Sequence, residues 1–183
     1  ADEDGRLCLE ILSWDGATFV RGPALTSTLY WGGIPFAMDY DGDGALELVY
    51  ALAGQDGVSL QLASFRADGG MLAVDVANLL PSDTDLIYGG SLLPVNLTGD
   101  EKDDLVYAYT VNDGTLVLRA CLSNGIGLLP QAPCTTALEF TGAITPVSVR
   151  GSGVIDLLFA YPDANALLAL TLVQLRLTKK GLA

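Results

Sequence analysis

The residues best suited to chemistry lie in an acidic loop, DYDGDGALE, at residues 39–47. Its acidic side chains occupy positions 1, 3, 5 and 9, so a tight turn can direct every second side chain inward, where oxygen ligands suit Ca²⁺. Three carboxylates within five residues also repel one another unless a cation neutralises them. The loop predicts a calcium site with four carboxylate ligands and one backbone carbonyl, contributed by Asp39, Asp41, Asp43, Glu47 and, through its carbonyl, Ala45.

Two other interpretations of this loop are weighed against the calcium site. The aspartates can instead cap their own backbone in a solvated turn that binds no metal. An EF-hand shares the first half of the pattern, but Leu46, Leu48 and Val49 continue into a strand-like run and no flanking helix is visible. We therefore favour calcium over the bare turn, and the bare turn over an EF-hand.

The acidic loop belongs to a segment that occurs three times without gaps. The copies read YWGGIPFAMDYDGDGALELVYAL, IYGGSLLPVNLTGDEKDDLVYAY and EFTGAITPVSVRGSGVIDLLFAY, at residues 30–52, 87–109 and 139–161. A shorter alternating segment recurs between them at residues 6–16, 59–69, 115–125 and 167–181. A repeat of about 55 residues is long enough for one four-stranded unit.

Every part of the repeat predicts strands. The runs LVYAL, LVYAY and LLFAY suit buried strands, whereas LCLEI, LQLAS and LVLRA alternate as half-buried strands do. Asp-Gly and Asn-Gly dipeptides supply hairpin turns, and no stretch has sustained helical periodicity. We expect one all-β repeat domain over residues 1–183, with units 6–58, 59–114 and 115–166, and with 167–183 as the first strand of a further unit or a closing strand.

The three copies resemble the FG-GAP or VCBS repeat, the β-propeller blade of integrin α-subunits, some fungal lectins and the B component of Tc-type toxins. The resemblance rests on the phrase P-V-D-x-(D/N)-G-D-G-x-x-D-L-V, which stands here as FAMDYDGDGALELV, PVNLTGDEKDDLV and PVSVRGSGVIDLL. It covers nearly the whole chain, although two copies have drifted from the consensus. It implies antiparallel four-stranded blades and a calcium ion that acts structurally, as a staple. Three blades do not easily close a ring, so we expect an open segment of a larger propeller or a ring completed by a homo-oligomer.

The other two copies of the loop carry fewer acidic residues. The second has about half the charge of the first and predicts at most a weaker site, with ligands Asn96, Thr98, Asp100 and Asp104 beside Lys102. The third places arginine at a ligand position, which predicts no bound cation and an ion pair between Arg150 and Asp156, flanked by Ser148 and Ser152.

Composition limits the possible partners. A net charge of −13 argues against nucleic acid and anionic membrane surfaces, which would repel the chain. No apolar stretch approaches the roughly 20 residues that span a bilayer, so membrane insertion is not expected. The first residues, ADEDGR, contain no basic or apolar signal region, so a secretory signal is either absent or already removed. We expect an extracellular or secreted protein, although the sequence leaves the location open. Three cysteines without CxxC spacing predict free thiols, or one disulfide and one thiol left over.

The sequence lacks the residues of common catalytic sites. It contains no histidine, no GxSxG, no HExxH and no P-loop. The carboxylate pairs Asp103–Asp104 and Asp83–Asp85 are better explained as loop and turn residues than as the acid and base of a glycosidase. We therefore expect no enzyme and no catalytic residue, and keep a glycoside-acting enzyme as the least favoured alternative.

Recognition is the function we expect, with a glycan or a protein as ligand. Trp14 is the ligand-contact candidate, because the repeat places no aromatic residue at the aligned positions Ala67 and Ser123. Trp31 and Tyr88 share one repeat position with Phe140, which predicts packing between blades. The alternative is a structural scaffold, as a segment of a larger secreted or toxin-type protein similar to the Tc B component.

Overall fold

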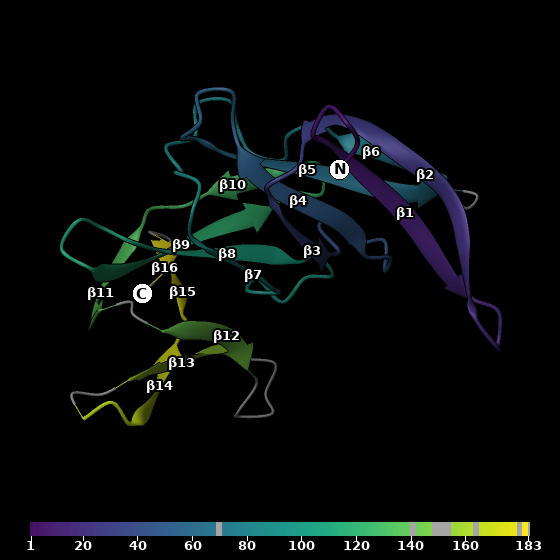
Figure 1. Ribbon diagram of the computed structural model, residues 1–183. Helices are drawn as coiled ribbons and strands as arrows, with labels where there is room; N and C mark the ends of the chain where they lie inside the picture. Colours follow the sequence, from purple (N-terminus) through teal and green to yellow (C-terminus); the bar gives the residue numbers. More distant parts are fainter. Residues whose placement is uncertain (69–70, 140–141, 148–154, 163–164, 179–180, 183) are drawn as a thin grey trace. The chain divides into compact units, whose positions relative to one another are not determined.

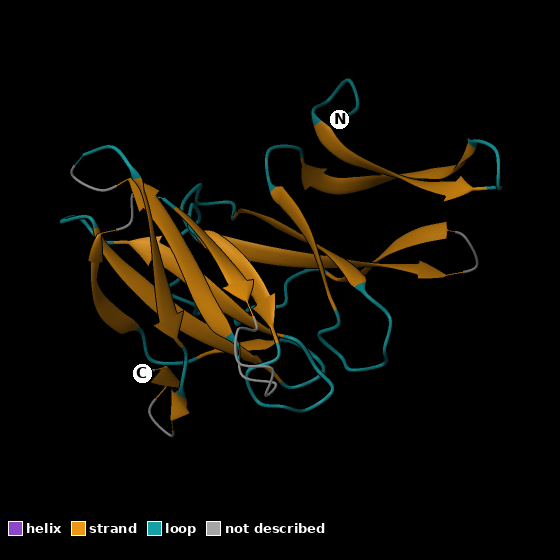
Figure 2. Cartoon of the chain, turned by 90° about the horizontal axis from the view of Figure 1, so that it is seen from below, coloured by secondary structure: helices purple, strands orange, loops and turns teal. Residues whose placement is uncertain are grey.

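The computed structural model describes residues 1–68, 71–139, 142–147, 155–162, 165–178 and 181–182 (Figure 1). Every regular element within these residues is a β-strand, and every strand pairing is antiparallel (Figure 2). The all-β prediction is therefore confirmed. The described residues include no helix long and apolar enough to cross a membrane. The chain divides into two compact units.

The first unit comprises residues Ala1–Met38, Leu46–Leu79 and Asp83–Tyr88. It contains a long hairpin of strands β1 (Arg6–Trp14) and β2 (Phe19–Tyr30). It also contains a four-stranded sheet in the order β3 (Ile34–Met38), β4 (Glu47–Ala53), β5 (Leu60–Asp68) and β6 (Met71–Val76). One apolar cluster of this unit contains the buried residues Leu7, Tyr50, Ala63 and Phe65.

The second unit comprises residues Asp39–Ala45, Leu80–Ser82 and Gly89–Ala183, so it includes the loop between β3 and β4. Its larger sheet contains β7 (Ser91–Val95), β8 (Asp104–Thr110), β9 (Thr115–Ser123), β10 (Leu128–Pro130) and β11 (Cys134–Glu139). Strands β7, β8 and β9 are neighbours in that order, and both β10 and β11 pair with β9.

Two further groups of strands complete the second unit. A three-stranded sheet has the order β12 (Ala143–Val147), β13 (Asp156–Pro162) and β14 (Leu168–Gln174). A short pair is formed by β15 (Leu177–Thr178) and β16 (Gly181–Leu182). One apolar cluster extends through both sheets and the short pair, with Leu118, Leu157, Phe159 and Leu182 among its members. No sheet among the described strands closes on itself.

The repeat seen in the sequence is also a repeat of strand register. The hairpins β3–β4, β7–β8 and β12–β13 pair at equivalent residues, Ile34 with Ala51, Ser91 with Ala108, and Ala143 with Ala160. Each hairpin then buries one acidic side chain at the first residue of its second strand, namely Glu47, Asp104 and Asp156. Each sheet continues to a third strand, from β4 into β5, from β8 into β9, or from β13 into β14.

A glycine before each of these hairpins is required by close backbone approach. A Cβ at Gly33, Gly90 or Gly142 would overlap the neighbouring strand. The nearest backbone oxygens would be 2.1, 2.6 and 1.8 Å away, on Ala51, Ala108 and Ala160 respectively. Real Cβ atoms do not approach a carbonyl oxygen this closely, so the glycine is a structural part of the repeat.

Strand β14 is the last strand of its sheet among the strands that the structure describes. It pairs with β13, and within the described residues no further strand lies on its other side. Three leucines on one face of the strand, Leu168, Leu170 and Leu172, are exposed. The whole of β14 carries no charge. The three cysteines form no disulfide with one another; Cys121 is buried, and Cys8 and Cys134 are half-buried.

Candidate functional site

Three of the predicted acidic ligands lie together in the loop between β3 and β4. Carboxylate oxygens of Asp39, Asp41 and Asp43 lie within 4.8 Å of one another. Asp39 and Asp41 are half-buried, whereas Asp43 is exposed. Because Ca²⁺ binds oxygen ligands at about 2.3–2.6 Å, oxygens this close can share one ion. The donor set contains only oxygen, which suits a hard cation.

The aspartate side chains of the loop accept hydrogen bonds from N–H groups of the loop's own backbone, and these contacts set its shape. Asp39 Oδ1 accepts a hydrogen bond from Gly42 N at 2.7 Å, and its Oδ2 accepts one from Gly44 N at 2.9 Å. Both glycines have positive φ, 79° and 84°, which most other residues adopt only with strain. The Asp-x-x-Gly-x-Gly spacing is thus what folds the loop around the first carboxylate.

The other two aspartates form similar short-range contacts. Asp41 Oδ1 accepts a hydrogen bond from Asp43 N at 3.1 Å, and Asp43 Oδ1 accepts one from Ala45 N at 2.8 Å. These are the contacts of a self-capped turn, so the turn interpretation and the calcium interpretation describe the same backbone. They differ only in whether a cation joins the carboxylates.

The loop is tied to the second repeat within the second unit. Asp39 N donates to Asp103 Oδ2 at 2.9 Å, and Asp103 N donates to the backbone oxygen of Asp39 at 2.7 Å. The hydroxyl of Ser123 donates to the backbone oxygen of Tyr40. Asp103 is therefore used to hold the first loop.

Glu47, predicted as the fourth carboxylate ligand, has a different environment. It begins β4 in the first unit, its exposed fraction is 2%, and its carboxylate lies 3.5 Å from the guanidinium of Arg66 on β5. The acidic group close enough to share an ion, among the described residues, consists of the three aspartates without Glu47. Ala45, predicted to offer its carbonyl, is exposed.

In the second loop the buried acid braces the backbone. Asp104 is fully buried; its Oδ2 accepts hydrogen bonds from Leu97 N at 3.0 Å and Thr98 N at 3.2 Å, and its Oδ1 accepts one from Ser123 N at 2.8 Å. Desolvation raises the pKa of this carboxyl above its ordinary value, against the opposing effect of these hydrogen bonds. Both oxygens of Asp104 are thus engaged inside the protein.

A lysine supplies positive charge to the rest of the second loop. Lys102 Nζ lies 2.8 Å from Asp100 Oδ2, and this contact lowers the pKa of Asp100. The amide of Asn96 accepts a hydrogen bond from Gly99 N at 2.6 Å and donates to the backbone oxygen of Asp100. The four residues predicted as ligands of a weaker site are therefore engaged with one another, with Lys102 and with the backbone.

The third loop lies mostly outside the described residues. Ser148, Arg150 and Ser152 belong to the segment 148–154, of which the structure gives no description. Asp156 is described and is fully buried at the start of β13, in the position that Asp104 holds in the second copy. The prediction that this loop binds no cation stays a prediction.

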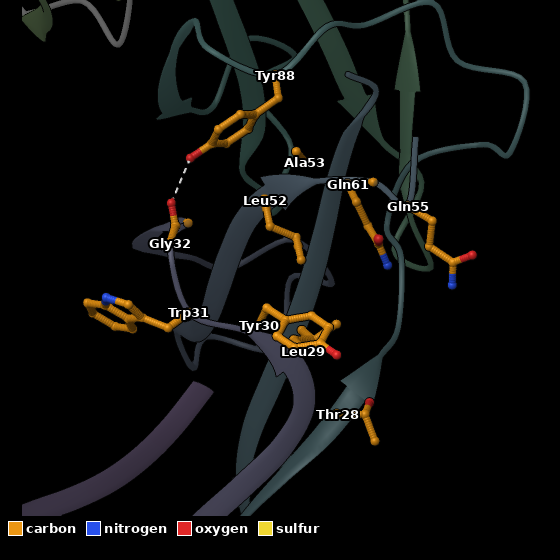
Figure 3. Close-up of a pocket in the computed structure, with 12 residues that line it drawn as sticks. Thr28, Leu29, Tyr30, Trp31, Gly32, Leu52, Ala53, Gln55, Gln61 and Tyr88 are labelled. Atoms are coloured by element: carbon orange, nitrogen blue, oxygen red, sulfur yellow. Dashed lines mark hydrogen bonds between the residues drawn. The ribbon is translucent and has the colours of Figure 1, made fainter. Parts of the chain in front are cut away.

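A hollow of about 770 Å³ lies in the first unit, at the end of β2 and beside the turn between β4 and β5 (Figure 3). Sequence reasoning did not identify it. Three aromatic residues and two glutamines contribute to its lining, namely Tyr30, Trp31, Tyr88, Gln55 and Gln61. None of the lining residues carries a charge.

Two tyrosine hydroxyls fix the backbone that carries Tyr30 and Trp31. Tyr50 Oη accepts hydrogen bonds from Gly32 N at 3.0 Å and from Gly33 N at 2.7 Å. Tyr88 Oη donates to the backbone oxygen of Gly32 at 3.1 Å, the contact drawn as a dashed line in Figure 3. The wall of the hollow is therefore held from two sides.

Trp14, the predicted ligand contact, is exposed at the tip of the β1–β2 hairpin. Its exposed fraction is 59%, and its ring meets Phe19 edge-on with centroids 5.2 Å apart. Trp31, predicted to pack between blades, has an exposed fraction of 60% and lines the hollow. The signal for the hollow was the pair Tyr30-Trp31 directly before two glycines, of which the repeat alignment assigned Trp31 to packing.

Comparison with known protein families, curated proteins and solved structures finds no match for this chain. The resemblance to FG-GAP repeats therefore rests on the repeated motif alone.

Proposed function

We propose that this chain is a non-catalytic recognition module, built of FG-GAP-like β-propeller blades that calcium stabilises, and that it binds a glycan or protein partner. The observation that carries this proposal is the uncharged aromatic hollow of the first unit, whose wall is fixed by Tyr50 and Tyr88. Exposed aromatic rings on a rigid sheet framework suit recognition.

The proposed blade architecture is supported by the shared register of three hairpins and by the four-stranded sheet β3–β6. A propeller needs at least four blades in the known examples. We propose that further blades come from a second copy of the chain or from the remainder of a larger propeller.

The proposed calcium ion would be held by Asp39, Asp41 and Asp43. It would neutralise three neighbouring carboxylates and so stabilise the turn from β3 to β4, a structural role without chemistry on a substrate. A site with three side-chain ligands on a surface loop suits the weak calcium affinities of extracellular modules, which agrees with an extracellular location.

Two measurements test the proposed function. Thermal unfolding with millimolar calcium and then with EDTA tests the ion, and we expect the unfolding temperature to be higher with calcium. A glycan array together with a panel of aryl glycosides tests the activity, and we expect retention of a glycan without hydrolysis. Hydrolysis of any glycoside contradicts the non-catalytic assignment. An unfolding temperature that is the same with calcium and with EDTA contradicts the calcium assignment.

A structural scaffold is the second candidate, favoured by β14, the last of the described strands in its sheet. The exposed leucines and the lack of charge along this strand suit pairing with a neighbouring blade in a larger assembly. Light scattering coupled to size exclusion distinguishes the candidates. A stable oligomer that binds no glycan and no protein partner supports the scaffold.

A further inference from the structure

We infer that the hollow of the first unit binds a neutral saccharide, with the rings of Tyr30 and Trp31 as separate apolar contacts and Gln55 and Gln61 as hydrogen-bonding groups. This inference rests on the proposed function, because it assigns a site and a ligand class to the recognition module.

The absence of charge in the hollow selects the ligand class. The chain has 22 acidic and 9 basic residues, yet none of these lines the hollow. An ionic ligand would lose hydration there without gaining an opposite charge, which is costly. Phosphorylated, sulfated, carboxylated and cationic ligands are therefore disfavoured, and neutral ligands remain.

The exposed rings supply an apolar surface for a sugar ring. Tyr30 and Trp31 are consecutive residues at the end of β2, with exposed fractions of 67% and 60%. In Figure 3 the Tyr30 ring lies near the middle of the lining residues, and Trp31 lies on the side away from Gln55 and Gln61. One face of a hexose presents mainly C–H groups, which pack favourably on the negative face of an aromatic ring.

The glutamine amides match the hydroxyl groups of a sugar. Each amide offers both donors and an acceptor, as a hydroxyl group requires. Gln61 Nε2 donates to the backbone oxygen of Ala77 at 3.0 Å, and this contact fixes the orientation of its amide. Aromatic rings together with neutral donors and acceptors suit a ligand ring with one C–H face and hydroxyls at its edge.

The backbone next to both rings is held in place without a ligand. The hydrogen bonds of Tyr50 and Tyr88 to Gly32 and Gly33 hold the backbone that carries both rings. Binding then costs less conformational entropy than it would on a mobile loop. The volume of about 770 Å³ lies within the range of pockets that hold small ligands.

A proline-rich peptide is the main competing occupant. Such peptides also use aromatic rings, but they adopt an extended helix and need an elongated groove. The glutamine amides in this lining suit a partner that both donates and accepts hydrogen bonds; proline offers no N–H donor, whereas every sugar hydroxyl does both. The saccharide is therefore the better match.

The test uses an array of neutral glycans, their sialylated counterparts and a proline-rich peptide, followed by calorimetric titration of the retained neutral glycan. We expect Trp31→Ala and Gln61→Leu each to weaken binding about ten-fold or more. The matched control is Phe19→Ala, which removes an aromatic side chain of similar exposure outside the hollow and should leave the affinity unchanged; Trp14→Ala tests the contact predicted from sequence. Unfolding temperatures of all variants check that each chain is folded.

Several results overturn the saccharide site. The inference is wrong if the array retains no neutral glycan, if the chain prefers the sialylated glycans, or if it retains the peptide instead. It is also wrong if Trp31→Ala and Gln61→Leu both leave the affinity unchanged. If Trp14→Ala alone abolishes glycan binding, the hollow is excluded while the recognition function stands. If neither glycan nor protein partner binds the chain, both fail.

Discussion

The first and second copies of the repeated hairpin share a backbone and differ in how they balance charge. β3–β4 and β7–β8 have the same register, the same close-packed glycine and the same buried tyrosine, whose hydroxyl accepts a hydrogen bond from that glycine's N–H. The loop of the first copy gathers three aspartates, whereas that of the second pairs one aspartate with Lys102. Backbone geometry is thus the constant part of the repeat, and loop charge is the variable part.

The largest effect should come from the shared glycine. We expect Gly33→Ala and Gly90→Ala each to lower the free energy of unfolding by about 3 kcal/mol, because the added Cβ overlaps a carbonyl oxygen of the neighbouring strand. Chemical denaturation measures both. A control is Gly16→Ala at the β1–β2 turn, where no atom lies near the added Cβ and only the strain of a positive φ is added. A loss in one copy alone would show that the two hairpins are not equivalent.

Replacing the buried acidic residue should lower the free energy of unfolding by different amounts in the two copies. Asp104→Ala leaves three backbone N–H groups without their carboxylate and should cost about 2–3 kcal/mol of unfolding free energy. Glu47→Ala should cost less, about 1 kcal/mol, because its partner Arg66 is partly exposed and can recover hydration. Equal losses in denaturant titrations would mean that Glu47 has a larger role than its ion pair.

Calcium should also distinguish the loops. At saturating calcium we expect the wild-type chain to gain about 2 kcal/mol of stability, and Asp39→Asn to remove that gain. Asn96→Ala, at the equivalent position of the second loop, should retain the calcium response. Thermal unfolding with calcium and with EDTA provides the measurement. Loss of the response in Asn96→Ala instead would place the ion in the second loop.

A smaller effect is expected from Lys102. Replacing it with Gln removes the contact with Asp100, a partly exposed ion pair that should be worth about 0.5 kcal/mol. Salt should reduce the difference between wild type and variant, because screening weakens such pairs. Denaturation at low and high ionic strength tests this, and a difference independent of salt would point to lost packing of the lysine stem.

The smallest expected effect is on the loss of stability at low pH, and here the first and second copies should behave alike. Asp56 and Asp113 occupy equivalent turns, and the pKa of each carboxyl lies below the ordinary 3.8. The main cause is a hydrogen bond from Val58 N for Asp56 and one from the Thr115 hydroxyl for Asp113. Their stabilisation is present above that pH and is lost as pH falls towards the lowered pKa. The double variant Asp56→Asn/Asp113→Asn should therefore lose less stability than wild type between pH 7 and pH 3. Parallel melting curves across this range would contradict the assignment.

The strands and the hairpin register followed from sequence because they depend on local patterns. Runs such as LVYAL and LVYAY are apolar enough to define β4 and β8, and the ungapped repeat carries one register to every copy. The ion pair of Glu47 did not follow, because Arg66 is placed beside it by the pairing of β4 with β5. The prediction that Glu47 is a metal ligand was therefore based only on its position in the loop sequence.

The hollow escaped prediction for a related reason. Aligning Trp31 with Tyr88 gave both residues one role, packing between blades. In the structure both residues line the hollow, but Trp31 offers an exposed ring, whereas Tyr88 also donates its hydroxyl to the backbone oxygen of Gly32. A repeat alignment shows where backbones are equivalent, and it hides the positions where side chains have diverged.

The uncharged edge of β14 has a consequence for handling the protein. Strands with open, apolar edges add to one another, and natural proteins discourage this by placing lysine there as a gatekeeper. No such residue interrupts Leu168–Gln174. The chain should therefore lose solubility with rising concentration, and Leu170→Lys, on the exposed face of that strand, should extend the concentration range in which it stays in solution.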